Sequence, residues 1–213
     1  AKRLEAISVR LEGPIAEDYS VYYRTHVQTF GWLDWAKDGA RAGSAQFAKR
    51  MEAVEIKLVK KDDDASRPEN VTDYYRCPLV SYQAHVQSYG WRPNAFDDAE
   101  GGVTGQSKRM EALKISLPDP VGTTGYSGGI KYRAHVQGIG WQDWKQDGEL
   151  IGTSGQAKRV EALQIALTGE IAQHYDVYYS LHMAKIGWTD YTIGNDATDH
   201  TAALAGSANL SKR

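Results

Sequence analysis

The chain is nearly without cysteine, since Cys77 is the only one among its 213 residues. A disulfide within the chain needs two cysteines, so the sequence excludes a disulfide-stapled scaffold and a cysteine-based metal cluster. It does not fix a compartment, because secreted proteins without disulfides also exist. Long apolar runs are missing as well. No stretch approaches the ~18 residues of a membrane-spanning helix, so membrane insertion is not expected.

An excess of charge of either sign is also missing, with 25 Lys and Arg against 27 Asp and Glu. A dedicated nucleic-acid binder usually carries a basic stripe, so nucleic acid is not expected as a partner. Phenylalanine is scarce, with 3 residues against 13 Tyr and 6 Trp. Tyr and Trp join an apolar body to a polar tip. That combination suits either half-buried rims of β-structure or surfaces that bind sugars.

Four near-copies of one pattern fill the chain. Its first half reads YRTHVQTFGW from Tyr23, YQAHVQSYGW from Tyr82, YRAHVQGIGW from Tyr132 and a divergent YSLHMAKIGW from Tyr179. Its second half reads KRLEAISVRL from Lys2, KRMEAVEIKL from Lys49, KRMEALKISL from Lys108 and KRVEALQIAL from Lys158. A Gly-rich passage separates the two halves. The pattern predicts a single domain of four units, residues 1–48, 49–107, 108–157 and 158–213.

Both halves of the pattern have the period of a β-strand. Leu163, Ile165 and Leu167 alternate with Gln164 and Ala166, which predicts one face on a core and one in solvent. The segment AQFAKRMEAVEIKL resembles a helix briefly, but its Ile-Lys-Leu end and Gly-rich approach favour a strand. Two insertions, KKDDDASRPEN from Lys60 and TIGNDATDHTAALAG from Thr192, are expected to be surface loops. The predicted fold class is all-β.

The two ends of the chain suggest how the repeats are arranged. Lys2-Arg3-Leu4-Glu5 begins a spare second-half strand, whereas the fourth unit stops at Ser211-Lys212-Arg213. Pairing of the N-terminal strand with the C-terminal repeat would close a compact ring of four ~50-residue repeats, propeller- or prism-like, and remove exposed strand edges. The alternative is a segment of a longer tandem array.

The combination HVQxxGW, GTxG and KRxEAxxIxL resembles the ChW repeat, a clostridial hydrophobic unit with a conserved Trp. The likeness covers nearly the whole chain. It weakens in the fourth unit, where Met183 and Ala184 replace Val and Gln. The resemblance implies a secreted or cell-surface protein of a Gram-positive bacterium, a non-catalytic module, and a part in cell-surface or polysaccharide contact. It assigns no binding residues.

Histidine recurs five residues before each Gly-Trp, and in three units a Gln follows it on the same strand face. These candidate ligand-binding pairs are His26 with Gln28, His85 with Gln87, and His135 with Gln137. Beside an indole, imidazole and amide groups could serve sugar hydroxyls. The alternative is that they satisfy backbone groups where strands meet turns, which a recurring device would do in every unit.

The tryptophans of the Gly-Trp pairs are expected to be structural core wedges, because Trp buries a large area. They are Trp32, Trp91, Trp141 and Trp188. The second aromatic position varies, as an exposed, ligand-tuned position would. Its candidate binding residues are Trp35, Trp144 and Tyr191, with Phe96 as a substitute in the second unit, where Asn94 occupies the position.

A recurring glutamate follows each Lys-Arg pair, at Glu5, Glu52, Glu111 and Glu161. Strand parity places it on the apolar face, so it must be paired with the Lys-Arg dipeptide or with a neighbouring His. Four equivalent carboxylates do not make one asymmetric glycosidase site, and no nucleophile motif is present, so no enzyme is expected. The spacing of the histidines is not that of a metal site, and no metal or cofactor is expected.

The leading functional hypothesis is therefore a carbohydrate-binding module with repeated aromatic sites, whose partner is a glycan such as a cell-wall or environmental polysaccharide. A protein-adhesion or structural spacer domain, with a protein partner, is the alternative from a different class.

Overall fold

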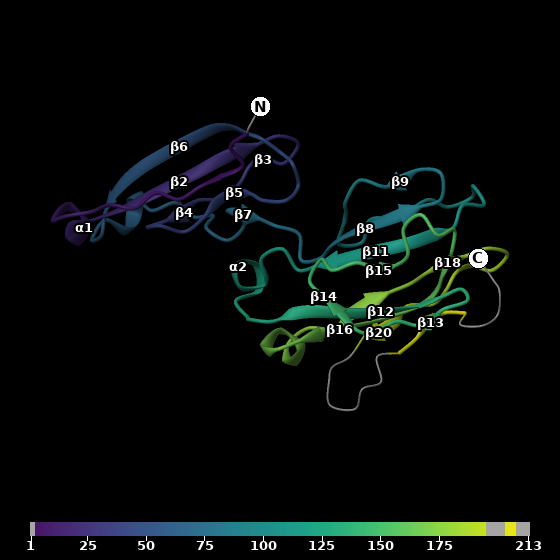
Figure 1. Ribbon diagram of the computed structural model, residues 1–213. Coiled ribbons are helices and arrows are strands. Elements are labelled where there is room, and N and C mark those ends of the chain that lie inside the picture. The colour runs from purple at the N-terminus through teal and green to yellow at the C-terminus, as the bar shows by residue number, and fades with distance from the viewer. Residues whose placement is uncertain (1–2, 195–202, 208–213) are drawn as a thin grey trace. The chain divides into compact units, whose positions relative to one another are not determined.

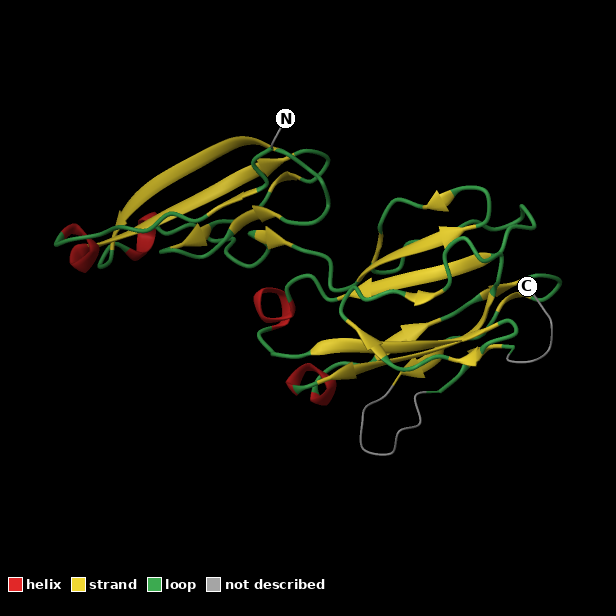
Figure 2. Cartoon of the chain, viewed as in Figure 1, coloured by secondary structure: helices red, strands yellow, loops and turns green. Residues whose placement is uncertain are grey.

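The computed structural model describes residues 3–194 and 203–207, and these fold into β-strands with two α-helices of one turn each (Figures 1 and 2). This confirms the all-β prediction. By its contacts the chain divides into two compact units, residues 1–78 and 79–213. The four repeat units drawn from the sequence pattern remain a prediction.

The first compact unit holds one copy of the repeat and the spare N-terminal strand. Its elements are β1 (Ala6–Ile7), α1 (Ile15–Asp18), β2 (Tyr19–Val27), β3 (Gly31–Trp32), β4 (Ala36–Lys37), β5 (Ala42–Ser44), β6 (Met51–Lys60), the 3-10 turn η1 (Asp64–Ser66) and β7 (Tyr75–Arg76).

The second compact unit holds the remaining copies. Its elements are β8 (Ser81–Val86), β9 (Gly90–Trp91), β10 (Ala95–Phe96), β11 (Met110–Ser116), α2 (Pro120–Thr124), β12 (Gly129–Val136), β13 (Gly140–Trp141), β14 (Lys145–Gln146), β15 (Ile151–Gly152), β16 (Val160–Thr168), η2 (Glu170–Gln173), β17 (Val177–Tyr179), β18 (His182–Met183), β19 (Gly187–Trp188), β20 (Thr192–Gly194) and β21 (Ala205–Gly206).

One plan recurs in the first three copies. A long strand carries the first half of the pattern, with its histidine, and a turn leads from it into a two-residue Gly-Trp strand that pairs with one of its edges. Its other edge pairs with the strand formed by the KRxEAxxIxL half of the pattern, which we call the Glu-Ala strand. In the third copy β12 pairs with β13 and β14 on one side and with β16 on the other. The first and second copies repeat this with β2 against β6 and β8 against β11.

Within the second compact unit, successive copies share a strand edge. β15 of the third copy pairs with β11 of the second, and β21 of the fourth pairs with β16 of the third. The N-terminal strand β1 pairs in the same way with β5, inside the first compact unit. The predicted ring, closed by this strand against the C-terminal repeat, is therefore wrong. The described residues form six separate sheets instead, and β1 finds an edge of the same kind at β5 within its own compact unit. Residues 195–202 of the second insertion and Ser211-Lys212-Arg213 lie outside the described residues.

Each shared edge brings two backbones so close that only glycine fits. A Cβ added at Gly152 would lie 2.3 Å from the carbonyl oxygen of Glu111 and 2.7 Å from Cα of Ala112. Gly152 also has a φ of +88°, a left-handed conformation that side chains disfavour. Gly43 and Gly206 meet the preceding strand in the same manner.

In the first, third and fourth copies the core wedge is the tyrosine that opens the motif, whereas Tyr82 of the second copy is half-buried. Tyr23 and Tyr132 are fully buried, and their hydroxyls donate to the carbonyls of Ala40 and Glu149. The Tyr132 hydroxyl also accepts from the backbone N–H of Ile115, on the preceding copy. Burial raises the pKa of Tyr132, because the ionised phenolate would lose its hydration.

None of the helices among the described residues is long and apolar enough to cross a bilayer.

Replacing Gly152 by alanine is expected to destabilise the second compact unit by about 3 kcal/mol, because the new methyl group collides with the backbone of β11. Gly155→Ala is the matched control. Its φ of +73° carries a similar conformational cost of about 1 kcal/mol, but nothing lies within 4 Å of its added Cβ. Urea unfolding curves of the two variants measure the difference. Equal losses of unfolding free energy in the two variants would mean that the close approach of β11 does not exclude a side chain at Gly152.

Candidate functional site

The Gly-Trp strand places an indole against the histidine of the long strand in all four copies. The register pairs are His26 with Trp32, His85 with Trp91, His135 with Trp141 and His182 with Trp188. Each pair meets edge to face, with ring centroids 5.3 to 5.5 Å apart. An edge-to-face contact orients the indole ring as well as holding it.

The recurring glutamate is the extra residue of a β-bulge. The register of β16 against β12 skips Glu161, so that Val160 lies opposite Val136 and Ala162 opposite His135. The same skip occurs at Glu52 and Glu111. A bulge re-aims one side chain out of the alternation of the strand. Strand parity, which assumes an unbroken ladder, therefore does not describe this residue.

The bulge lets the carboxylate meet both the expected basic residue and the histidine. Glu161 accepts a hydrogen bond from Arg159 Nη2 at 2.7 Å, and its other oxygen lies 3.1 Å from Nδ1 of His135. The second copy repeats these distances at 2.8 and 3.2 Å, and the first copy does the same. We call these three residues the His–Glu–Arg triad of each copy. Glu5, on the spare strand, lies 3.9 Å from Arg3.

The triads differ in burial. In the third copy the side chains of His135 and Glu161 are 6% and 5% exposed, so this charged group is inside the protein. In the first copy His26 and Glu52 are 34% and 33% exposed. A charge partner matters most where water cannot replace it. The same residues are therefore a core element in one copy and a surface pair in another.

Three of the four Gly-Trp indoles are more exposed than core wedges would be. Trp32, Trp141 and Trp188 are 42%, 36% and 53% exposed, and the recurring tyrosine fills the core position instead. The signal for this was present in the sequence, because the tyrosine is repeated in every copy. Parity placed Tyr132 on the face of Ala134 and Val136, both of which are fully buried.

The first and third copies each hold an arginine between two indoles. The Arg24 guanidinium lies 4.9 Å from the ring centroids of both Trp32 and Trp35. In the third copy Arg133 lies 4.9 Å from Trp141 and 4.8 Å from Trp144. We call these arrangements the Trp–Arg–Trp stacks. Cation–π attraction fixes both indoles on a single cation, so predicted site residues Trp35 and Trp144 are brought together with the Gly-Trp indoles.

The second copy has no such stack. Gln83 takes the place of the arginine and donates to the carbonyl of Arg92, while Lys114 lies 5.0 Å from the Trp91 ring. Phe96 is half-buried in β10, which pairs with β8. The predicted substitution of Phe96 for the second tryptophan stays a prediction.

The glutamines of the motif contribute backbone hydrogen bonds to the strand pair. Their backbone N–H groups close the end of the strand pair by donating to the arginine carbonyl of the triad. These bonds are Gln28 to Arg50, Gln87 to Arg109, and Gln137 to Arg159, at 2.9 to 3.0 Å.

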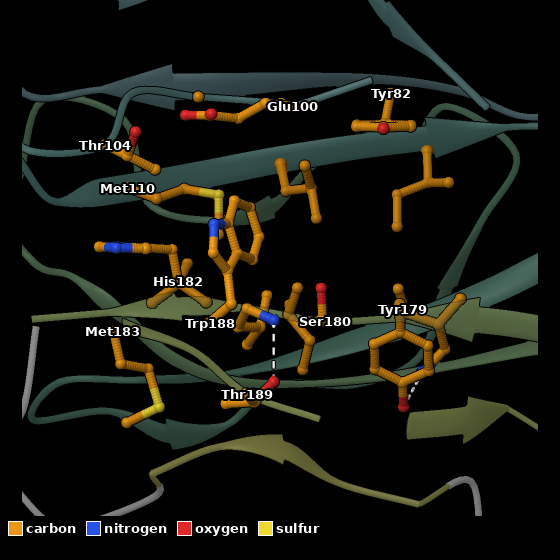
Figure 3. A pocket seen from close by; sticks show the side chains of 18 of the residues that line it. Tyr82, Glu100, Thr104, Met110, Tyr179, Ser180, His182, Met183, Trp188 and Thr189 are labelled. Carbon is orange, nitrogen blue, oxygen red and sulfur yellow. Dashed lines mark hydrogen bonds between the residues drawn. The ribbon is translucent and has the colours of Figure 1, made fainter. Parts of the chain in front are cut away.

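The fourth copy borders a cavity of about 1060 Å³ in the second compact unit. Figure 3 shows the Trp188 indole pointing from β19 toward Met110, with His182 beside it and Glu100 and Tyr82 on the opposite wall. Tyr191, 72% exposed, also lines the cavity. Burial raises the pKa of Tyr82 to about 12, with help from the carboxylates of Asp98 and Asp97.

Within residues 3–194 and 203–207, no cluster of three or more His, Cys, Asp or Glu side chains could hold a metal ion.

The family model described as "Clostridial hydrophobic W" matches three segments of the chain, residues 26–60, 85–119 and 135–169. Each segment runs from the histidine of one copy to the end of its Glu-Ala strand or just beyond. No curated protein and no solved structure matches the chain.

Replacing Glu161 by glutamine is expected to lower the free energy of unfolding by about 3 kcal/mol, because Arg159 is then left buried without a counter-charge. Glu52→Gln changes the same residue of the exposed triad and should cost about 1 kcal/mol or less. Chemical unfolding of both variants gives the comparison. A larger loss of unfolding free energy for Glu52→Gln than for Glu161→Gln would contradict the expectation that the buried triad contributes more to stability.

Proposed function

Because this chain belongs to the family of clostridial hydrophobic W repeats, we propose that it is a non-catalytic, secreted or cell-surface binding module that recognises carbohydrate through its exposed tryptophans. The observation that carries the proposal is the Trp–Arg–Trp stack of the first and third copies, in which partly exposed indoles are held in fixed orientation.

Rigid, exposed aromatic rings match the chemistry of a sugar. The C–H face of a pyranose packs on an indole, and its hydroxyls need donors and acceptors around that ring. Trp141 borders a pocket of about 320 Å³ whose other walls include Gln142, Asp143 and Lys145. This pocket has the size of a small-ligand subsite and offers both donors and acceptors.

Fixing the indoles in advance lowers the cost of binding, because less side-chain freedom is lost when the ligand arrives. The arginine is fixed as well: Arg24 donates to Glu55 at 2.6 Å and Arg133 to Gln164 at 2.7 Å. Two stacks in one chain could also engage one polysaccharide together, which multiplies weak single-site affinities.

Replacing both Trp35 and Trp144 by alanine is expected to reduce binding to a responsive polysaccharide at least tenfold, because each stack loses one of its two indoles. Polysaccharide pull-down and a glycan array measure the loss. Circular dichroism checks that the β-structure is kept.

Tyr178→Ala is the control for a general loss of surface aromatics, since Tyr178 is 57% exposed and belongs to neither stack. Unchanged binding in the Trp35→Ala, Trp144→Ala double variant would refute recognition through the stacks. An equal loss of binding in the Tyr178→Ala variant would show that the effect is not specific to the stacks.

A second candidate function is a protein-adhesion or spacer domain, favoured by one exposed strand face in the first compact unit. Val54, Ile56 and Leu58 of β6 are 46%, 57% and 51% exposed. Their counterparts in the second and third copies, such as Leu113 and Ile115, are buried. A row of exposed aliphatic side chains on one strand is typical of a surface that meets another protein.

If β6 makes such a contact between copies of the chain, Ile56→Lys should shift sedimentation equilibrium toward the monomer, because a charge would enter an apolar interface. Lys57→Glu, on the same strand, is the control for a change of charge alone. A chain that is monomeric at all concentrations before mutation would argue against self-association through β6.

A further inference from the structure

A cation lies over the Gly-Trp indole in each of the first three copies, but it does not always come from the same strand. In the first and third copies it is the arginine of the Trp–Arg–Trp stack, on the long strand. In the second copy it is Lys114 of the Glu-Ala strand, 5.0 Å from the centroid of the Trp91 ring. The cation is therefore common to the three indoles, although the strand that supplies it differs.

The residue that faces this cation across the strand pair differs in charge among the copies. In the first copy Arg24 lies opposite Glu55, and the two form a salt bridge of 2.6 Å. In the third copy the stack arginine lies opposite the neutral Gln164. In the second copy Lys114 lies opposite the neutral Gln83. The cross-strand pair beside the indole is therefore neutral in the first copy and positive in the second and third.

Further cations over aromatic rings in the second and third copies also lack a counter-charge. Arg92 lies 5.3 Å from the centroid of the Tyr89 ring, and Lys131 lies 5.3 Å from that of Trp144. Within the part of the chain that the structure describes, neither makes a salt bridge, and the same is true of the cations over the Gly-Trp indoles of these two copies. Both copies thus place positive charge beside aromatic rings.

The first compact unit differs, because cations that lie over its rings have carboxylate partners. Three such cations form salt bridges, and each removes the net charge beside its ring. The pairs are Arg24 with Glu55, Lys37 with Asp38, and Arg76 with Asp73.

The guanidinium of Arg133 keeps hydrogen-bond donors that no protein group uses. Its Nε donates to Gln164 at 2.7 Å, whereas its two Nη groups meet no acceptor among the described residues. Arg133 is half-buried, so an ion that reaches it is partly shielded from water. The guanidinium geometry suits a carboxylate, which accepts two parallel hydrogen bonds in the plane of the group.

Charges of both signs lie near the stack of the third copy. Lys145 is 3.8 Å from Glu149, so these two offset each other. Asp143 is exposed and lines the adjoining pocket. This single carboxylate stands against Arg133 and Lys131, which leaves the third-copy site with a net positive charge.

The second and third copies are joined through a shared strand edge, so their two sites belong to one body. β15 of the third copy pairs with β11 of the second, which carries Lys114. Gln142, directly after the Gly-Trp strand of the third copy, bonds Gly152 of β15 in both directions, at 2.6 and 3.2 Å. Two positive sites held in one body match a polymer whose anionic groups repeat.

We propose that the second and third copies recognise an acidic polysaccharide whose sugar rings carry carboxylates, as in a polyuronate. The C–H face of each sugar packs on the indole, and its carboxylate binds the cation beside that indole. The aromatic contact requires a sugar ring, which favours a uronate over a phosphate polymer without sugars. The stack of the first copy, neutralised by Glu55, contacts sugar without selecting for charge. This inference rests on the proposed carbohydrate binding and names the class of sugar.

The test compares polygalacturonate with its methyl ester, because esterification removes the negative charge and keeps the sugar ring. Calorimetry with the intact protein gives the ratio of the two affinities. We expect polygalacturonate to bind about tenfold more tightly, as charged hydrogen bonds predict. Raising the salt concentration from about 0.05 to about 0.5 M should reduce this ratio, because salt screens exposed charges. Poly(glycerol phosphate) should bind more weakly than polygalacturonate.

Reciprocal substitutions exchange the residue opposite the stack arginine. Gln164→Glu gives the third copy the carboxylate of the first and should lower the affinity ratio, whereas Glu55→Gln should raise it. Lys114→Gln removes the cation of the second copy and should also lower the ratio. Arg67→Gln is the control for net charge, since Arg67 pairs with Asp64 in a loop of the first compact unit. It should leave the ratio unchanged.

The possible failures are distinguishable. Equal affinities for polygalacturonate and its methyl ester, or a ratio that Gln164→Glu and Lys114→Gln leave unchanged, would overturn the selection of acidic sugars but not the binding of carbohydrate. Tighter binding of poly(glycerol phosphate) than of polygalacturonate would overturn the assignment to a uronate. A folded protein that binds no polysaccharide, acidic or neutral, would refute the proposed function and this inference with it.

Discussion

The architecture depends on one constraint, the approach of a glycine backbone to the Glu-Ala strand of the preceding copy. At Gly152 the backbones of β15 and β11 come closer than any side chain allows, and the N–H of Thr153 donates to the carbonyl of Glu111. The contact makes β11 and β16 each part of two copies at once. A copy is therefore not a complete folding unit by itself, because one edge of its sheet is supplied by its neighbour.

The bulge at the glutamate adds a polar core to this shared strand. Glu161 is buried, but it meets Arg159, just before its own strand, and His135 of the neighbouring strand β12. Because the histidine also orients the indole of the Gly-Trp strand, one carboxylate positions a basic group, an imidazole and an aromatic ring. The carbohydrate proposal thus uses indoles whose orientation is set from inside the sheet.

Much of this architecture could be predicted from the sequence, because the apolar residues follow the two-residue period of a β-strand. Alternation of apolar and polar residues identified the strands, and it correctly placed Tyr132, Ala134 and Val136 on the core face. What alternation could not reveal is the bulge, since an extra residue leaves no mark in composition. It also could not reveal which strand β1 joins, because the edges that accept a Glu-Ala strand are alike in every copy.

The expected core position of the Gly-Trp indoles illustrates a second limit. Tryptophan is expected in the core because burying it removes a large area from water. That area does not determine which of two recurring aromatic residues fills the core. Tyr132 does so because its hydroxyl finds two backbone partners inside the sheet. The indole of Trp141 is left at the surface, where Arg133 and His135 hold it.

Variation among the copies then separates the recurring scaffold residues from the positions proposed to bind a ligand. The tyrosine, the histidine and the Gly-Trp pair recur in every copy, whereas the position after the tyrosine changes from Arg24 to Gln83, Arg133 and Ser180. A stack needs both an arginine at that position and a second tryptophan, which Asn94 and Tyr191 replace in the second and fourth copies. A stack can therefore be lost by one substitution that leaves the shared strand untouched, so the proposed ligand recognition and strand sharing can vary independently in this chain.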